Sequence, residues 1–236
     1  RTNYVEPARN FALRCAQGKH ILVLDADEEI PATLVKKLKE IADEDTIDYV
    51  RIPRKNIIFG KWMQYSRWWP DYNIRFFKKG KVIWDGKIHS VPKTLGQGID
   101  LETRQENAII HYNYVSLDQY LERLTRYSQI QADQLIESGY KFSWQDLISK
   151  PVSEFLSRFF AGEGYKDGVH GLVLACLQAF SEFVVYVRVW ERQGFEEQET
   201  PGVFSEMEKT TDEVRWWLAA KTKSPLGKLL HKIRSR

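Results

Sequence analysis

Hydrophobic and polar positions follow two different patterns in the two halves of this chain. Up to residue 113, segments with helical spacing alternate with short apolar runs bounded by Gly, Pro or charged residues. From residue 114 onward, apolar residues recur three or four positions apart over long stretches. Short bounded runs are typical of strands and the longer spacing of helices. The pattern therefore predicts an α/β domain over residues 1–113 and a helical region over residues 114–236.

One apolar run, residues 21–24, ends abruptly on a cluster of carboxylates. Gly18 before it and Pro31 after it bound the run, which we interpret as a central strand buried on both faces. Side chains alternate along an extended chain, so Asp25 and Asp27 are expected to point to the same side. Two close carboxylates repel each other unless a cation neutralises them. The spacing therefore predicts a site for Mg²⁺ or Mn²⁺, completed by the phosphate oxygens of a substrate.

A structural role is the main alternative for these acids, and two known acidic motifs do not fit the segment. Asp25 and Asp27 could simply end the strand and help to cap the helix that Pro31 begins. A phosphatase motif of the Asp-x-Asp-x-Thr type needs a hydroxyl at the position of Glu29. A calcium loop of the EF-hand type needs a Gly and spaced acids that this segment lacks.

Helices and strands surround the acidic cluster. Apolar residues at helical spacing predict helices over residues 7–18 and 31–42. A helix followed directly by a buried strand is half of a parallel α/β unit. Beyond residue 48 the pattern changes to strands, which we expect at residues 49–53, 56–59, 73–77, 82–84 and 107–112.

Aromatic residues are concentrated between residues 62 and 72, in a segment too irregular for a helix. Indole rings bind the C–H faces of sugars, so one interpretation is an acceptor-binding loop with Trp62, Trp68 and Trp69. The other is a small hydrophobic cluster beneath a long loop.

Histidines at strand ends are further candidates for the metal site. His111 and His89 both lie at predicted strand ends, where a lone His is usually structural. With the Asp pair upstream, His111 is a credible metal ligand, since neutral imidazole binds Mn²⁺. His20 and His170 are expected to be packing residues.

The C-terminal half contains helices with clear boundaries. Ser116 and Gln119 form a capping box, and two shorter helices are expected to begin at Ser143 and Pro151. The most apolar helix is expected over residues 169–193. Because polar residues interrupt it, we favour a helix that lies in a membrane interface or packs against its neighbours over one that spans a membrane.

The C-terminal end combines basic and aromatic residues. Six Lys and Arg residues lie between Lys221 and Arg236, with no acid after Glu213 and with Trp216 and Trp217 nearby. Such a basic amphipathic end is attracted to anionic lipid, so we expect association with an anionic membrane surface. The alternative is a solvated, frayed end.

Composition sets the remaining limits. With 236 residues, of which 43% are hydrophobic, the chain can bury the core of one or two domains. A formal charge of +3 is too small to indicate nucleic-acid binding. Cys15 and Cys176 lie at apolar positions of predicted helices, so we expect buried, reduced thiols, as in the cytosol. No signal peptide is recognisable and the first residue is not Met, which suggests part of a longer protein.

Two sets of residues resemble a known enzyme family. The first set consists of Arg9-Asn10 on a helix, Gly18, and then Ile21-Leu22-Val23-Leu24-Asp25-Ala26-Asp27-Glu28. This set resembles the second half of the donor domain in family 2 glycosyltransferases, which have the GT-A fold. The resemblance covers most of the chain and implies that residues 1–113 are the second half of a Rossmann-like nucleotide-sugar domain. The second set consists of Ile110-His111-Tyr112-Asn113-Tyr114 and Tyr165-Lys166-Asp167-Gly168-Val169-His170-Gly171-Leu172. This set resembles the bacterial lipopolysaccharide core glucosyltransferase-like branch of the same family.

The resemblance implies transfer of a sugar, with inversion, from a nucleotide donor such as UDP-glucose to a lipid-linked or cell-surface glycan at the cytosolic face of the membrane. Asp27 would ligate the metal that bridges the donor diphosphate, and His111 would complete the metal site. Asp25 would contact the donor ribose or the metal. Three further residues match positions that bind the donor, namely Arg9, Asn10 and Arg75.

The chain departs from the family pattern in two places. The branch usually has His-Glu where this chain has His89 and Ser90, and Ser90 cannot act as a general base. His89, Asp85 and Asp71 remain candidates for the base that removes the acceptor proton. The family's opening strand and nucleotide-base pocket also precede the region where this chain starts.

Three hypotheses of function follow, with a glycosyltransferase as the leading one. The second is a non-catalytic module that binds glycan or membrane, suggested by Ser90 and by the aromatic, basic C-terminal half. The third is a metal-dependent phosphohydrolase built on the same carboxylates. Donor sugar, acceptor and linkage depend on loop shapes that periodicity does not report.

Overall fold

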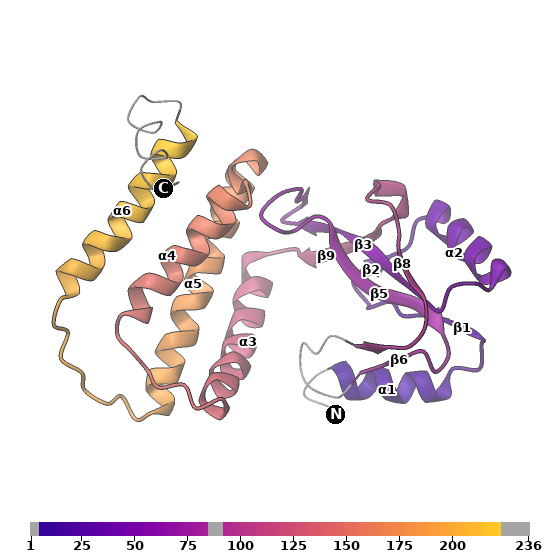
Figure 1. The fold of residues 1–236 in the computed structure, drawn as a ribbon, viewed down its shortest axis with the longest axis horizontal. Helices are drawn as coiled ribbons and strands as arrows, with labels where there is room; N and C mark the ends of the chain where they lie inside the picture. The colour runs from indigo at the N-terminus through magenta and orange to yellow at the C-terminus, as the bar shows by residue number, and fades with distance from the viewer. Residues whose placement is uncertain (1–4, 85–91, 223–236) are drawn as a thin grey trace. The chain divides into compact units, whose positions relative to one another are not determined.

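The computed structural model describes residues 5–84 and 92–222, and these form two compact units (Figure 1). The α/β unit contains residues up to Trp62 together with Trp68–Asn113. The helical unit contains Met63–Arg67 together with the chain from Tyr114 onward. The short segment 63–67 therefore packs with the helical unit, although the residues on both sides of it in the chain belong to the α/β unit.

A mixed sheet forms the centre of the α/β unit, and its first strand pairs in the antiparallel direction rather than in the parallel α/β unit that the sequence predicted. Its main path runs β1-β5-β3-β9-β2, and β4 and β8 also pair with β3. Strand β8 runs parallel to β3, whereas β4 and β5 pair with it in the antiparallel direction. The seven strands are β1 (His20–Leu22), β2 (Glu28–Glu29), β3 (Tyr49–Ile58), β4 (Lys61–Trp62), β5 (Asp71–Lys78), β8 (Gly98–Asp100) and β9 (Ile109–Tyr114). A separate antiparallel pair joins β6 (Val82–Ile83) to β7 (Lys93–Thr94).

Two helices cover opposite faces of this sheet (Figure 1). Phe76 and Phe77 are neighbours on β5, so their side chains point to opposite faces. Phe76 packs in the cluster that includes Leu34 and Leu38 of α2 (Ala32–Glu44). Phe77 packs in the other cluster, against which Leu13 of α1 (Val5–Cys15) lies. The helix predicted over residues 31–42 is confirmed as α2, with Pro31 at its N-cap.

The predicted central strand is wrong in both its length and its position. Strand β1 has three residues and lies at the end of the strand order, where it pairs antiparallel with β5. After Val23, the chain makes a turn in which Glu28 N–H donates to the Asp25 carbonyl at 3.0 Å. A Glu28 carboxylate oxygen in turn accepts from the Asp25 N–H at 3.0 Å. Side-chain bonds of this kind compete with strand pairing, so Asp25 and Asp27 lie in a turn and strand alternation does not apply to them.

Other local predictions need smaller corrections. The two strands expected over residues 49–59 are one strand, β3, which has an irregularity between Val50 and Arg51. Cys15 and Cys176 are unpaired thiols but are exposed, so their predicted burial is wrong. His20 stacks on Phe76 with ring centroids 5.5 Å apart, which confirms it as a packing residue.

The helical unit is built around one long apolar helix, α5 (Val169–Arg192). Helices α3 (Leu117–Glu137) and α4 (Asp146–Leu156) both pack on α5, and α6 (Val203–Lys221) packs on α4 (Figure 1). The predicted cap of α3 is confirmed at Ser116, whose Oγ accepts from Gln119 N–H at 3.2 Å. The reciprocal bond of the capping box is shifted by one residue, because Gln119 Oε1 accepts from Val115 N–H at 2.8 Å.

Pro151 does not begin a helix, contrary to the prediction. It lies inside α4, where proline has no backbone N–H to donate to a carbonyl of the preceding turn. A π-helical turn (Ser157–Ala161) and a short 3-10 helix (Gly164–Asp167) follow before α5 begins.

Helix α5 is long and apolar enough to cross a membrane by length and composition. Only 28% of its most apolar 18-residue window is buried within the protein. The predicted basic end falls largely on residues 223–236, which lie outside the described residues.

Candidate functional site

The first group of candidate site residues surrounds Asp25. Arg9 Nη2 on α1 donates to both carboxylate oxygens of Asp25 at 2.7 Å, and Arg75 Nη2 on β5 donates to one of them at 2.7 Å. The same Arg75 nitrogen donates to Glu28 Oε1 at 2.6 Å. Two arginines thus hold two carboxylates together close to the point where the chain leaves β1.

Burial makes these charges dependent on one another. The side chain of Arg75 is 4% exposed and that of Glu28 is 0% exposed, so neither charge has water as an alternative partner. Burial alone would raise the pKa of Asp25. The charge on Arg75 and the hydrogen bonds from Arg9 and Arg75 outweigh that effect and lower the pKa, which keeps Asp25 ionised.

The second group fixes the protonation state of His111. Asn56 is fully buried on β3, and its Nδ2 donates to the Trp68 carbonyl at 2.9 Å. Its Oδ1 is therefore the acceptor that faces His111 Nδ1 at 2.6 Å, so Nδ1 carries the proton and Nε2 keeps a lone pair. Burial and the positive charge of Arg54 lower the pKa of His111, which favours this neutral ring. Its Nε2 lies 3.7 Å from Asp27 Oδ2.

Backbone pairing brings Asp27 to His111. Tyr112 N–H donates to the Asp27 carbonyl at 2.9 Å, and Glu28 is the register partner of His111 between β2 and β9. The short strand that follows the turn therefore determines which acidic side chain reaches the imidazole.

The Asp27 and His111 pair fits a divalent cation by its chemistry. A carboxylate oxygen and an imidazole nitrogen with a lone pair are both ligands for Mn²⁺, and the Nδ1 bond to Asn56 is the orienting contact typical of a metal-bound His. Within residues 5–84 and 92–222, no three His, Cys, Asp or Glu side chains gather into a group that could hold a metal. Asp27 and His111 are therefore the candidate ligands among the described residues, and Asp25 lies against the arginines instead.

Asp71 belongs to the same network. Its Oδ2 accepts from Arg54 Nε at 2.9 Å, from Arg54 Nη2 at 2.6 Å and from Asn56 Nδ2 at 3.2 Å. Asn56 therefore bridges Asp71 and His111. Arg54 Nη1 also lies 3.4 Å from Glu28 Oε1, which connects this network to the carboxylates around Arg75. The other two candidates for the catalytic base, His89 and Asp85, lie outside the described residues.

Two of the three tryptophans pack together. The rings of Trp62 and Trp69 meet edge to face with centroids 5.3 Å apart, and the Lys55 ammonium lies 4.7 Å from the centre of the Trp62 ring. The Trp62 indole N–H is buried without a hydrogen-bond partner among the described residues. Trp68 is joined to the His111 network, because its carbonyl accepts from Asn56.

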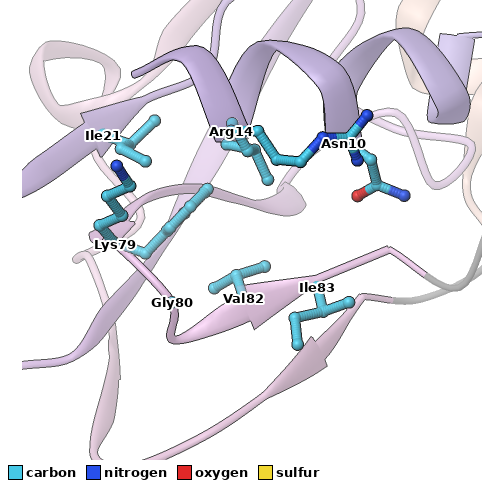
Figure 2. Close-up of a pocket in the computed structure, with 9 residues that line it drawn as sticks. Asn10, Arg14, Ile21, Lys79, Gly80, Val82 and Ile83 are labelled. Atoms are coloured by element: carbon cyan, nitrogen blue, oxygen red, sulfur yellow. The ribbon is translucent and has the colours of Figure 1, made fainter. Parts of the chain in front are cut away.

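Asn10 lies apart from both groups. Its Nδ2 donates to the Trp84 carbonyl at 2.8 Å, and it lines a pocket of about 400 Å³ between α1 and β6. Figure 2 shows Asn10 and Arg14 on the helix facing Val82 and Ile83 on the strand. The residues that line this pocket include none of the acids described above.

Sequence reasoning missed three site residues: Glu28, Arg54 and Asn56. Positions 52, 54, 56 and 58 share one face of β3, and two of these are apolar and buried. A buried amide and an arginine on such a face were a detectable signal, because buried polar groups need partners. The partners themselves become visible only when β3, β5 and β9 lie side by side.

Comparison with known proteins finds similarity to glycosyltransferases. Residues 2–95 match the family described as glycosyl transferase family 2. The chain is 26% identical over 191 residues to the lipopolysaccharide core biosynthesis glycosyltransferase LpsC of Rhizobium meliloti (strain 1021), which covers 78% of this chain and 68% of that protein. It is 26% identical over 192 residues to an uncharacterized glycosyltransferase of Rickettsia typhi (strain ATCC VR-144 / Wilmington), covering 78% of this chain and 66% of the relative. The match thus spans about two thirds of each relative's length.

Proposed function

We propose that this chain is a family 2 glycosyltransferase, as the comparisons support, and that it transfers a hexose from a nucleotide sugar such as UDP-glucose, with inversion, to a lipid-linked or cell-surface glycan. The observation that carries the proposal is the buried Asn56 that leaves a lone pair on His111 Nε2, 3.7 Å from Asp27. A relative named for lipopolysaccharide core biosynthesis supports an acceptor in envelope lipopolysaccharide or polysaccharide.

We assign the metal site to Asp27 and His111, with the donor diphosphate completing it. A divalent cation bound there would neutralise the charge that develops on the departing nucleoside diphosphate. Asn56 holds the imidazole in the tautomer that leaves Nε2 available, and the antiparallel pairing of β2 with β9 holds Asp27 beside it.

We assign Asp25 to the donor ribose. A carboxylate offers about four lone-pair positions, of which Arg9 and Arg75 occupy three through their hydrogen bonds. One position remains for a hydroxyl donor, whereas two adjacent guanidinium groups would repel a cation. Arg9 and Arg75 then act on the donor by keeping Asp25 ionised and in place, and Asn10 remains a candidate contact to the donor.

The candidates for removal of the acceptor proton are His89, Asp85 and Asp71. Asp71 Oδ2 already accepts hydrogen bonds from Arg54 and Asn56, so these partners compete with the acceptor hydroxyl for this oxygen. We therefore favour His89 or Asp85 for the proton and assign Asp71 to positioning Asn56. Trp62, Trp68 and Trp69 are proposed to bind the acceptor glycan, and the buried Trp62 N–H is a donor suited to a sugar hydroxyl.

We further propose a peripheral location on the inner face of the cell membrane. Five apolar residues of α5 are exposed at spacings typical of one helix face, and this supports contact with lipid. They are Val169, Leu172, Val173, Phe180 and Phe183.

The test of the proposed function is calorimetric titration of the chain with UDP-glucose and other nucleotide sugars, with and without Mn²⁺. We expect one donor to bind only with Mn²⁺, and we expect Asp27→Ala and His111→Ala to abolish that binding. Asp100→Ala removes an exposed carboxylate of the same unit, paired with Arg51, and serves as the control. Binding that is independent of Mn²⁺, or that survives both substitutions, would exclude the assigned metal site.

A further inference from the structure

The segment 63–67 is held by a buried carboxylate on the turn before α5. The Asp167 side chain accepts from Gln64 N–H at 3.2 and 3.3 Å and from Tyr65 N–H at 2.9 Å. Asp167 is 2% exposed, so these bonds form away from water. One side chain thus binds two consecutive backbone amides of a segment about a hundred residues earlier in the chain.

Further bonds continue this attachment at Ser66. Its N–H donates to the Gly162 carbonyl at 2.7 Å, and its Oγ donates to the Arg158 carbonyl at 2.8 Å. Arg158 Nη1 donates back to the Ser66 carbonyl at 3.0 Å. Every backbone polar group of Ser66 is therefore bonded within the helical unit.

Two residues of the segment have a strained backbone, which the hydrogen bonds described above stabilise. Ser66 and Arg67 have φ angles of 60° and 68°, a region that side chains other than glycine rarely adopt. The facing backbone approaches so closely that a Cβ on Gly164 would lie 2.7 Å from Ser66 Oγ. The fit of the segment thus depends both on Asp167 and on a glycine opposite Ser66.

We propose that Asp167 is a positioning residue for the acceptor: by fixing residues 64–66 it sets the orientation of Trp62 and Trp68, which adjoin the segment in the chain. This rests on the proposed acceptor role of those tryptophans. A segment held in a strained conformation at two amides and at Ser66 has little freedom, so its flanking residues are restricted as well. Asp167 contacts no reacting group in this assignment and acts only through the segment.

The test compares Asp167→Asn with the unaltered chain. The amide keeps the shape of the side chain but has no negative charge and only one acceptor oxygen, so the hydrogen bonds from Gln64 N–H and Tyr65 N–H become weaker. We expect hydrogen exchange at residues 64–66 to accelerate, measured by mass spectrometry. With UDP-glucose as donor and deacylated rough-form lipopolysaccharide as acceptor, we expect the acceptor KM to rise about 10- to 100-fold while the donor KM and the UDP-glucose hydrolysis rate stay within about twofold.

Asp133→Asn is the control, since Asp133 is an exposed acid of the same unit that pairs with Arg192. Unchanged exchange at residues 64–66 in Asp167→Asn would overturn the attachment. Faster exchange with both KM values unchanged, or with both raised equally, would overturn the positioning role. Absence of transfer by the unaltered chain would instead refute the proposed function on which the inference rests.

Discussion

Arg75 shows how much of the candidate site depends on single charges. Its guanidinium nitrogen binds Asp25 and Glu28 at once, and almost none of its surface reaches water. Because the Glu28 side chain has no exposed surface either, removal of Arg75 would leave a buried carboxylate with the Asp25 N–H and the longer contact to Arg54 as its partners among the described residues.

We therefore expect Arg75→Met to lower the free energy of unfolding by about 3–5 kcal/mol, the usual cost of breaking a buried pair from one side. Urea denaturation measures this value. The matched control is Arg51→Met, which removes an exposed pair with Asp100 and should cost less than about 1 kcal/mol. Equal costs for the two substitutions would contradict the buried network.

A second prediction at this scale concerns Asn56. Asn56→Ala leaves Asp27 and His111 in place but removes the acceptor that holds the proton on His111 Nδ1. Loss of such an orienting contact typically weakens metal binding about 10- to 100-fold. Titration of Mn²⁺ in the presence of UDP-glucose measures the effect, with Asn107→Ala as a control, since that amide donates to the Glu102 carbonyl. Unaltered affinity in Asn56→Ala would separate the imidazole from the metal site.

At the scale of single residues, the sequence predicted only some of the contacts. Asp27 and His111 were named as partners and do lie together. Asp25 was expected to point the same way as Asp27, but strand alternation cannot anticipate a turn in which a side chain and the backbone bond to each other. Asn56 stands out as a polar residue on an apolar face of β3, but its partners lie on strands far apart in the chain and could not be read from the sequence.

Among the elements, the start of α5 is the most restrictive. Gly168 precedes the helix with φ 66° and ψ −140°, a combination that is essentially limited to glycine. An added Cβ would meet no atom within 4 Å, so the cost of a substitution comes from the backbone alone.

Gly168→Ala is accordingly expected to destabilise the chain by about 1–3 kcal/mol, measured by denaturant unfolding. Gly139→Ala is the comparison, because Gly139 ends α3 in the left-handed region that Ala reaches at a cost of about 1–2 kcal/mol. A neutral effect of Gly168→Ala would show that the turn before α5 can change its conformation freely.

Elements were predictable where local chemistry defines their ends. The cap at Ser116 and the helix after Pro31 follow from side chains that bond or restrict the adjacent backbone. The prediction for Pro151 was wrong because proline is common in the first turn of a helix but is not confined to it. The packing of α4 on α5 compensates for the one hydrogen bond that Pro151 does not make. The prediction of β1 as a central strand was wrong because an apolar run does not show whether a strand pairs with other strands on one side or on both.

For the whole molecule, the exposed face of α5 determines where the protein is expected to work. Phe180 and Phe183 are 49% and 39% exposed and stack on each other. Replacing both with Ser removes apolar surface worth about 1.5–3 kcal/mol per side chain on full burial, so binding to lipid should weaken at least about tenfold. Cosedimentation with phosphatidylglycerol vesicles measures this effect.

Two controls accompany that measurement. Phe204→Ser alters a side chain that is 84% exposed on α6 and should leave binding unchanged. Phosphatidylcholine vesicles test whether the negative charge of the lipid contributes. Equal binding by the unaltered chain and the double variant would exclude this face of α5 as the contact.

The attachment of segment 63–67 also limits how this protein can diverge. Because the helical unit holds a piece of chain that lies between two strands of the α/β unit, the two units are not separable by any single cut. A recombination event that exchanged only the chain after residue 113 would pair one lineage's Ser66 with another lineage's Asp167 and Gly164. The first half of the gene and the second half are therefore expected to be inherited together.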